Sequence, residues 1–156
     1  MSSPPIRSAR LAMAMILATG LLLASGCGGD DDSAARSPAK LSADLRYVRD
    51  GGFAGDHDVL VIRPDGRAQL TRQRGRDAAF ALSQEEIAKV AAAVQGAKLD
   101  KLSPKSTSPK PVPDAFVYTV SYRGHTVETD DDAMPRSLAP LRQQLDLLVT
   151  KHAKQR

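Results

Sequence analysis

The chain contains one cysteine, no tryptophan and only four per cent aromatic residues among its 156 residues. A single cysteine excludes an intramolecular disulfide and a zinc site built from several cysteine ligands. The shortage of aromatic side chains argues against a stacking platform for sugars or single-stranded nucleic acid. The folded part of the chain must therefore depend on its hydrophobic core alone.

Patterns that carry catalysis are also missing. The three histidines, His57, His125 and His152, show no spacing typical of metal ligands. The acidic run 130–132 lacks the glycine and the distal glutamate of a calcium loop. No serine or threonine occupies a nucleophile elbow, and the glycine-rich segment 51–55 precedes a predicted strand, whereas a phosphate-binding loop precedes a helix. We therefore expect no enzymatic activity, no bound metal and no cofactor.

The net charge of +4 and the isoelectric point near 9.4 overstate the basic character of the folded region. Without Arg7 and Arg10, 20 basic and 18 acidic residues remain, so we expect no nucleic-acid partner. Charge is instead concentrated locally, in the acidic run 130–132 and in an arginine-rich hairpin. We expect both groups to be solvated surface charges. The arginines are Arg63, Arg67, Arg72, Arg74 and Arg76.

Residues 1–26 have the three parts of an export signal. Arg7 and Arg10 provide a positive start, and an apolar run over 11–24 is too short for the ~20 residues of a membrane span. Small residues at 24–26 then precede Cys27, which resembles the lipobox of bacterial lipoprotein precursors. The alternative is an ordinary secreted protein in which this thiol has no role.

The lipobox resemblance implies that the thiol of Cys27 carries a diacylglyceryl group and that this residue becomes the new N-terminus. We therefore expect a lipoprotein anchored, through acyl chains such as palmitate, on the extracytoplasmic side of the cell membrane. Residues 27–40 are polar and have no apolar period, which predicts a flexible tether. A folded domain is predicted over 41–150 and a C-terminal tail over 151–156.

Periodicity within 41–150 predicts an α+β fold, in which an antiparallel sheet of about five strands carries two helices on one face. Ser83 and Glu86 form a capping box at the start of the first helix, which Gly96 is expected to end. Ser137 is the expected N-cap of the second helix. Four prolines exclude regular structure from 103–113. Strands are expected near 41–47, 59–62, 67–74, 116–122 and 127, and the second of these is expected to be buried on both faces.

The segment Gly51, Gly52, Phe53, Ala54 and Gly55 lies between two predicted strands. Glycines permit positive φ angles at little steric cost, so the segment predicts a special turn. The aromatic side chain has two possible positions. It is either held outward for a partner or folded inward as a plug for the core, and we give the inward position slightly more weight.

The order of three segments resembles the emfourin family of protein inhibitors of protealysin. Residues 45–55 are similar to that family's first strand and its Gly-Gly-Phe-Ala-Gly motif. Residues 114–120 are similar to its Asp-x-Phe-x-Tyr strand. The C-terminal part of the family's sequence is similar to residues 125–127, to Met134 with Pro135, and to residues 138–141. The resemblance therefore covers about 43–149.

The emfourin resemblance implies inhibition of thermolysin-like zinc metallopeptidases by occlusion of the active-site cleft. The expected partner is therefore an exported thermolysin-like metallopeptidase. Our hypothesis is that residues 51–55 form the inhibitory loop and that Phe53 supplies the bulky apolar side chain these enzymes favour just after the scissile bond. The alternative is an envelope lipoprotein adaptor that binds another protein, with no protease involved.

Overall fold

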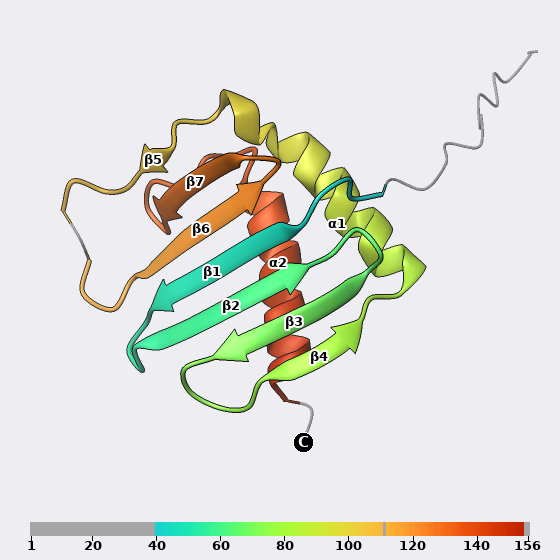
Figure 1. Cartoon of the computed structure of the whole chain (residues 1–156). Helices are drawn as coiled ribbons and strands as arrows, with labels where there is room; N and C mark the ends of the chain where they lie inside the picture. Colours follow the sequence, from blue (N-terminus) through green and yellow to red (C-terminus); the bar gives the residue numbers. More distant parts are fainter. Residues whose placement is uncertain (1–39, 111, 155–156) are drawn as a thin grey trace, which may run out of the picture. The chain divides into compact units, whose positions relative to one another are not determined.

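The computed structural model describes residues 40–110 and 112–154. The predicted signal peptide, Cys27 and all but the last residue of the predicted tether lie outside these residues. The described chain forms one sheet with two helices (Figure 1). The elements are β1 (Leu45–Gly51), β2 (Asp56–Ile62), β3 (Arg67–Arg72), β4 (Ala78–Ala81), α1 (Gln84–Ala97), the 3₁₀ helix η1 (Leu99–Lys101), β5 (Lys105–Ser106), β6 (Phe116–Tyr122), β7 (His125–Asp130) and α2 (Ala139–Ala153). Neither helix is long and apolar enough to cross a membrane.

The sheet has seven strands in the order β4-β3-β2-β1-β6-β7-β5. All neighbours are antiparallel except β5 and β7. The expectation of a purely antiparallel sheet of about five strands was therefore wrong, because β4 and β5 were not foreseen. Strand β5 lies in the proline-rich segment expected to have no regular structure. Proline has no N–H to donate, but the Pro104 carbonyl accepts a bond from the Glu128 N–H at 2.8 Å, which brings Lys105 and Ser106 beside β7.

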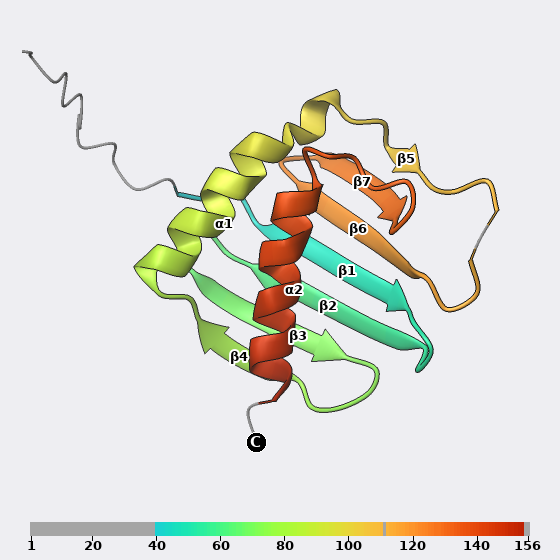
Figure 2. The same cartoon turned by 180° about the vertical axis from the view of Figure 1, so that it is seen from behind.

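Both helices cover the same face of the sheet, as the periodicity predicted (Figure 2). Inward side chains of the strands pack against one apolar side of each helix. The opposite face of the sheet is open, so Val59 and Val61 are only half-buried. The expectation that this strand is buried on both faces was wrong, because within the described residues no second layer of helices covers it. The largest fully buried side chains are Leu45, Tyr47, Leu60, Ile62, Leu70, Val90, Val120, Val127, Leu138, Leu141, Leu145 and Val149.

Helix α1 begins with the predicted capping box. The Ser83 hydroxyl accepts a bond from the Glu86 N–H at 3.2 Å, and the Glu86 carboxylate accepts one from the Ser83 N–H at 2.8 Å. The helix continues one residue past Gly96, and Lys98 then adopts the left-handed conformation with φ of 49°. A non-glycine residue therefore ends this helix.

Helix α2 differs from expectation at both ends. Ser137 is not the N-cap, because a turn runs directly into the helix and the Pro135 carbonyl accepts bonds from the N–H groups of Leu138 and Ala139 at 2.9 and 3.1 Å. At the other end the helix continues to Ala153, where His152 is buried against Phe80 with ring centroids 3.5 Å apart. The folded domain therefore extends into the predicted tail.

The capping residue Glu86 leads to a test of pH-dependent stability. A hydrogen bond from Lys151, followed by the backbone bond from Ser83, lowers the pKa of Glu86 from 4.5 to about 2. Its stabilising contribution is therefore complete above pH 4.5 and is lost as the pH falls toward 2. We expect Glu86→Gln to lower the free energy of unfolding by about 1 kcal/mol at pH 7 and by almost nothing at pH 2.

Urea denaturation at several pH values measures this difference. Glu85→Gln is the matched control, because Glu85 forms only an exposed pair with Lys89, at 2.6 Å. Its effect at pH 7 should be clearly smaller than that of Glu86→Gln, because solvent screens the pair. A Glu86→Gln effect that is independent of pH would contradict the assignment.

Candidate functional site

The glycine-rich segment forms the tip of the hairpin that joins β1 to β2. Gly51 pairs with Asp56 in the last rung of the ladder. The Gly55 N–H donates to the Gly52 carbonyl at 2.9 Å and closes a turn that contains Phe53 at its second position. The three glycines have φ angles of 112°, 72° and 62° in chain order, all in the region that L-residues rarely adopt. The glycines therefore set the shape of this tip.

The side chain of Phe53 points away from the protein and is 94% exposed. Its inward alternative, as a plug for the core, was therefore wrong. The space beneath the tip is occupied by Phe116, the first residue of β6. Its ring is partly buried against the core and extends the row of inward side chains that continues with Tyr118 and Val120.

Two of the glycines allow the tip to lie directly against the start of β6. A Cβ atom at Gly52 would lie 2.4 Å from Cζ of Phe116, and one at Gly51 would lie 2.4 Å from the carbonyl oxygen of Ala115. The Gly52 N–H also donates to that carbonyl at 3.5 Å. The tip is thus supported from below, whereas a Cβ atom at Gly55 would meet only open space.

The contrast between these glycines leads to a second test. Gly52→Ala is expected to lower the free energy of unfolding by about 2 to 3 kcal/mol, because it adds a clash with the Phe116 ring to the cost of a left-handed alanine. Gly55→Ala carries only the backbone cost, about 1 kcal/mol. Thermal or urea denaturation measures both. Equal effects of the two substitutions would mean that Phe116 does not support the tip.

A buried ion-pair network lies beneath the hairpin. Asp58 is 1% exposed and accepts bonds from Arg49 at 2.6 Å and from Arg72 at 2.9 Å. The Arg49 guanidinium also lies 5.1 Å from the centre of the Phe116 ring. A chain of contacts therefore joins Gly52, through Phe116 and Arg49, to Asp58. The sequence contains a signal for this network that we did not use, since Asp58 has the same strand parity as the inward residues Leu60 and Ile62.

Two tyrosines extend the polar network toward α2. The Tyr47 hydroxyl donates to Asp146 at 2.6 Å, and burial, followed by this carboxylate, raises the pKa of Tyr47 far above its ordinary value. Burial, and then the hydrogen bond to Asp131 at 2.8 Å, raises the pKa of Tyr118 to about 12. Both phenols therefore stay protonated at neutral pH and act as hydrogen-bond donors, which is a structural role.

The charged runs behave differently from expectation. Asp130 is buried and accepts bonds from the N–H groups of Ser108 and Ala133 at 2.5 and 2.8 Å, and these bonds lower its pKa. Asp131 accepts the Tyr118 bond, so the acidic run is not simply a solvated surface. It holds two loops in place. Of the five arginines, four are exposed as expected, whereas Arg72 is held by Asp58.

The neighbouring residues of the motif Asp56-His57-Asp58 point to opposite faces of the sheet. His57 pairs with Asp50 at 2.9 Å on the open face, whereas Asp58 faces the helices. Over residues 40–110 and 112–154, no group of three histidine, cysteine, aspartate or glutamate side chains is placed to hold a metal ion.

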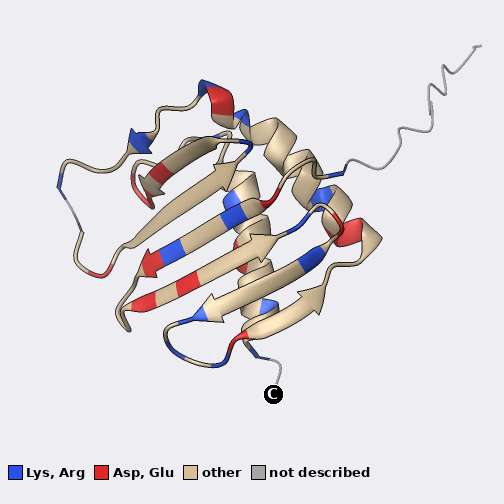
Figure 3. Ribbon diagram, in the orientation of Figure 1, with Lys and Arg blue, Asp and Glu red and all other residues tan. Residues whose placement is uncertain are grey.

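The features around Phe53 share one end of the sheet, formed by residues 52–55, 73–77 and 112–115, which we call the hairpin end. The Gln73 N–H bonds to the His57 carbonyl, and Ala115 contacts Gly52. Val112, in the 112–115 segment, is 52% exposed. Figure 3 shows basic residues on the loop between β3 and β4. An exposed aromatic on a protruding, well-supported turn is suited to enter the surface of another macromolecule.

Comparison with known proteins identifies the domain. The family model of emfourin matches residues 47–146, which run from β1 through the first half of α2 and include the hairpin end. No curated protein matches the chain. Since the matched region covers well over half of the sequence, the chain belongs to the emfourin family and carries a metallopeptidase-inhibitor-like domain.

Proposed function

We propose that this protein is a membrane-tethered inhibitor of an exported thermolysin-like metallopeptidase and that the 51–55 hairpin occludes the active-site cleft of that enzyme. One observation carries the proposal beyond family membership. Phe53 is 94% exposed at the tip of a hairpin whose glycines pack against β6. A large apolar side chain exposed in this way has a cost in water that binding in an apolar pocket removes.

The geometry of the hairpin suits occlusion of a cleft. The turn projects Phe53 beyond the last rung of the β1–β2 ladder, so the side chain can enter a pocket while the sheet remains outside. A supported turn also loses little conformational freedom on binding, which improves affinity without new contacts. Val112 and the loop 73–77 lie on the same end and would contact the rim of the cleft. Substrate is then excluded by the body of the domain.

Inhibition by the purified chain 28–156 tests this function directly. Every core residue of the described domain lies at or after Leu41, so this fragment contains the complete core. We expect competitive inhibition of a thermolysin-type peptidase, with an inhibition constant in the micromolar range or below. Absence of inhibition at micromolar concentrations would contradict the proposal and favour the adaptor alternative.

The tether is the second part of the proposed function. Lipidation of Cys27 would confine the inhibitor to the extracytoplasmic membrane surface, and a flexible 28–40 segment would raise its concentration near membrane-associated targets. We expect the wild-type precursor to be found in the membrane fraction with an acylated N-terminus at residue 27. Cys27→Ser should abolish acylation, as measured by mass spectrometry of the mature N-terminus. An acyl-free wild-type protein in the soluble fraction would contradict this part of the proposal.

A further inference from the structure

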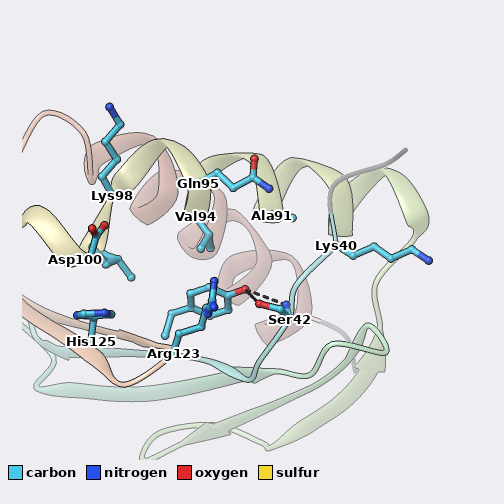
Figure 4. A pocket seen from close by; sticks show the side chains of 11 residues that line it. Lys40, Ser42, Ala91, Val94, Gln95, Lys98, Asp100, Arg123 and His125 are labelled. Atoms are coloured by element: carbon cyan, nitrogen blue, oxygen red, sulfur yellow. Dashed lines mark hydrogen bonds between the residues drawn. The ribbon is translucent and has the colours of Figure 1, made fainter. Parts of the chain in front are cut away.

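A groove of about 480 Å³ lies between the last turns of α1, η1 and the turn that joins β6 to β7 (Figure 4). Val94 and Leu99 contribute apolar surface to it. Tyr122 forms part of its wall, where the Tyr122 hydroxyl oxygen accepts a bond from the Ser42 N–H at 2.9 Å. The groove therefore combines apolar surface with polar walls, which is the composition of a ligand site.

The charges around this groove are mostly positive. The groove is lined by Lys40, Lys98 and Arg123. Within the described part of the chain, none of these three residues forms an ion pair. Among its described lining residues the one carboxylate, Asp100, forms a salt bridge with Lys101 at 3.3 Å. Figure 4 shows Lys40 and Lys98 extending outward from opposite sides of the groove. The groove is thus suited to attract an anion near its mouth.

The position of the groove relates it to the membrane. Ser42 and Lys40 lead directly into β1, so the groove lies at the beginning of this strand and the Phe53 hairpin lies at its end. Seven residues of strand separate the two by about 20 Å. Twelve residues separate Cys27 from Lys40, and a flexible segment of that length has a mean end-to-end distance of roughly 20 Å. A lipid attached to Cys27 would therefore keep the groove close to the bilayer surface.

We propose that this groove binds the phosphate headgroup of anionic membrane lipids and thereby holds the Phe53 hairpin away from the bilayer. The inference rests on the proposed lipid attachment at Cys27. The Arg123 guanidinium, which lies within the groove, contacts the phosphate, and Lys40 and Lys98 attract it from the two sides of the mouth. The small exposed parts of Val94 and Leu99, each 6% exposed, contact the glyceryl carbons, a part that free phosphate lacks. The inhibitory end of the domain then faces exported enzymes.

Sedimentation of the chain 28–156 with vesicles tests the site. We expect binding to phosphatidylcholine vesicles that contain phosphatidylglycerol and none to phosphatidylcholine alone. Lys98→Gln combined with Arg123→Gln should weaken the binding roughly 25-fold, because each basic residue near an anionic surface contributes about fivefold. The matched control is Arg74→Gln with Arg76→Gln, which removes the same charge from the hairpin end and should leave the binding unchanged.

Three results would overturn the proposal. An equal loss of vesicle binding in both double variants, and an absence of binding by the wild type, would each exclude a specific role for the groove. Displacement from vesicles by inorganic phosphate at the concentration of the lipid phosphate would identify a site for free phosphate. Thermal denaturation of each double variant shows that the fold is retained.

Orientation is measured on the chain 27–156 coupled through Cys27, its sole cysteine, to a maleimide lipid in nanodiscs. With phosphatidylglycerol present, hydrogen exchange should slow at 94–100 and 122–125 and stay unchanged at 51–56. Slowed exchange at the hairpin would overturn the orientation. Peptidase inhibition is assayed separately without lipid, so a failure of the proposed inhibition leaves the vesicle result intact and the two failures are distinguishable.

Discussion

Replacement of Asp58 by alanine is expected to lower the free energy of unfolding by about 3 kcal/mol, the effect of removing one partner from a buried ion pair. The Asp58 carboxylate is 1% exposed and is the shared partner of Arg49 and Arg72. Without it, two guanidinium groups on β1 and β3, the strands that flank β2, repel each other with little access to water. The remaining carboxylate near Arg49, Asp146, lies at 3.8 Å and already bonds to Tyr47 and Arg142.

Urea denaturation at neutral pH measures the Asp58→Ala effect. Glu128→Ala is the matched control, because the Glu128–Lys105 pair has a similar distance of 2.7 Å but is exposed to solvent. This control should change the free energy of unfolding by less than about 1 kcal/mol. Similar effects of the two substitutions would mean that burial does not distinguish the pairs. Because Arg49 also covers the Phe116 ring, Asp58→Ala should increase hydrogen exchange in the 51–55 hairpin.

Local signals explain the parts of the fold that the sequence predicts well. The capping box of α1 depends on two residues three positions apart, and the turns at 64–66 and 123–124 depend on glycine at single positions. Alternation of apolar residues along the strands identifies the inward face of the sheet. The apolar stripe on each helix indicates that the helices cover this face. These patterns are complete within a few residues of chain, so the order of the main elements and the single helical layer follow from them.

The missed features depend on partners far apart in the chain. Strand β5 exists because Pro104 meets Glu128, and Asp130 is buried because the loop containing Ser108 folds over it. Ser137 has the composition of an N-cap, but the carbonyl of Pro135 takes that role. The conformational propensity of single residues does not reveal such contacts, which form only when distant segments come together in the folded protein.

The position of Phe53 illustrates the same limit at the candidate site. Phe53 and Phe116 approach the same end of the sheet from distant parts of the chain, and only one ring can fill the space beneath Gly52. Phe116, Tyr118 and Val120 are alternate residues of β6, so their side chains lie on the same face of the sheet. Phe53 lies in a turn, where side chains do not alternate between two faces. The regular strand therefore supplies the buried ring, and the turn presents the exposed one.

Truncation of that exposed ring gives the sharpest functional prediction. Phe53→Ala is expected to raise the inhibition constant against a thermolysin-type peptidase about 30- to 1,000-fold, which corresponds to the 2 to 4 kcal/mol of a central aromatic anchor. The melting temperature should stay the same, because a side chain that is 94% exposed contributes almost nothing to the core. Inhibition and thermal stability are measured on the same preparation of the chain 28–156.

Two further variants separate an anchor from a general apolar contact. Leu147→Ala removes another exposed apolar side chain, one that lies on α2 outside the hairpin end, and should leave both inhibition and stability unchanged. Phe53→Leu keeps apolar volume and should recover part of the affinity that alanine loses. Unchanged inhibition by Phe53→Ala would place the contact with the peptidase elsewhere on the domain. Loss of inhibition in Phe53→Ala alone, at constant melting temperature, means that the turn acts through the side chain it exposes.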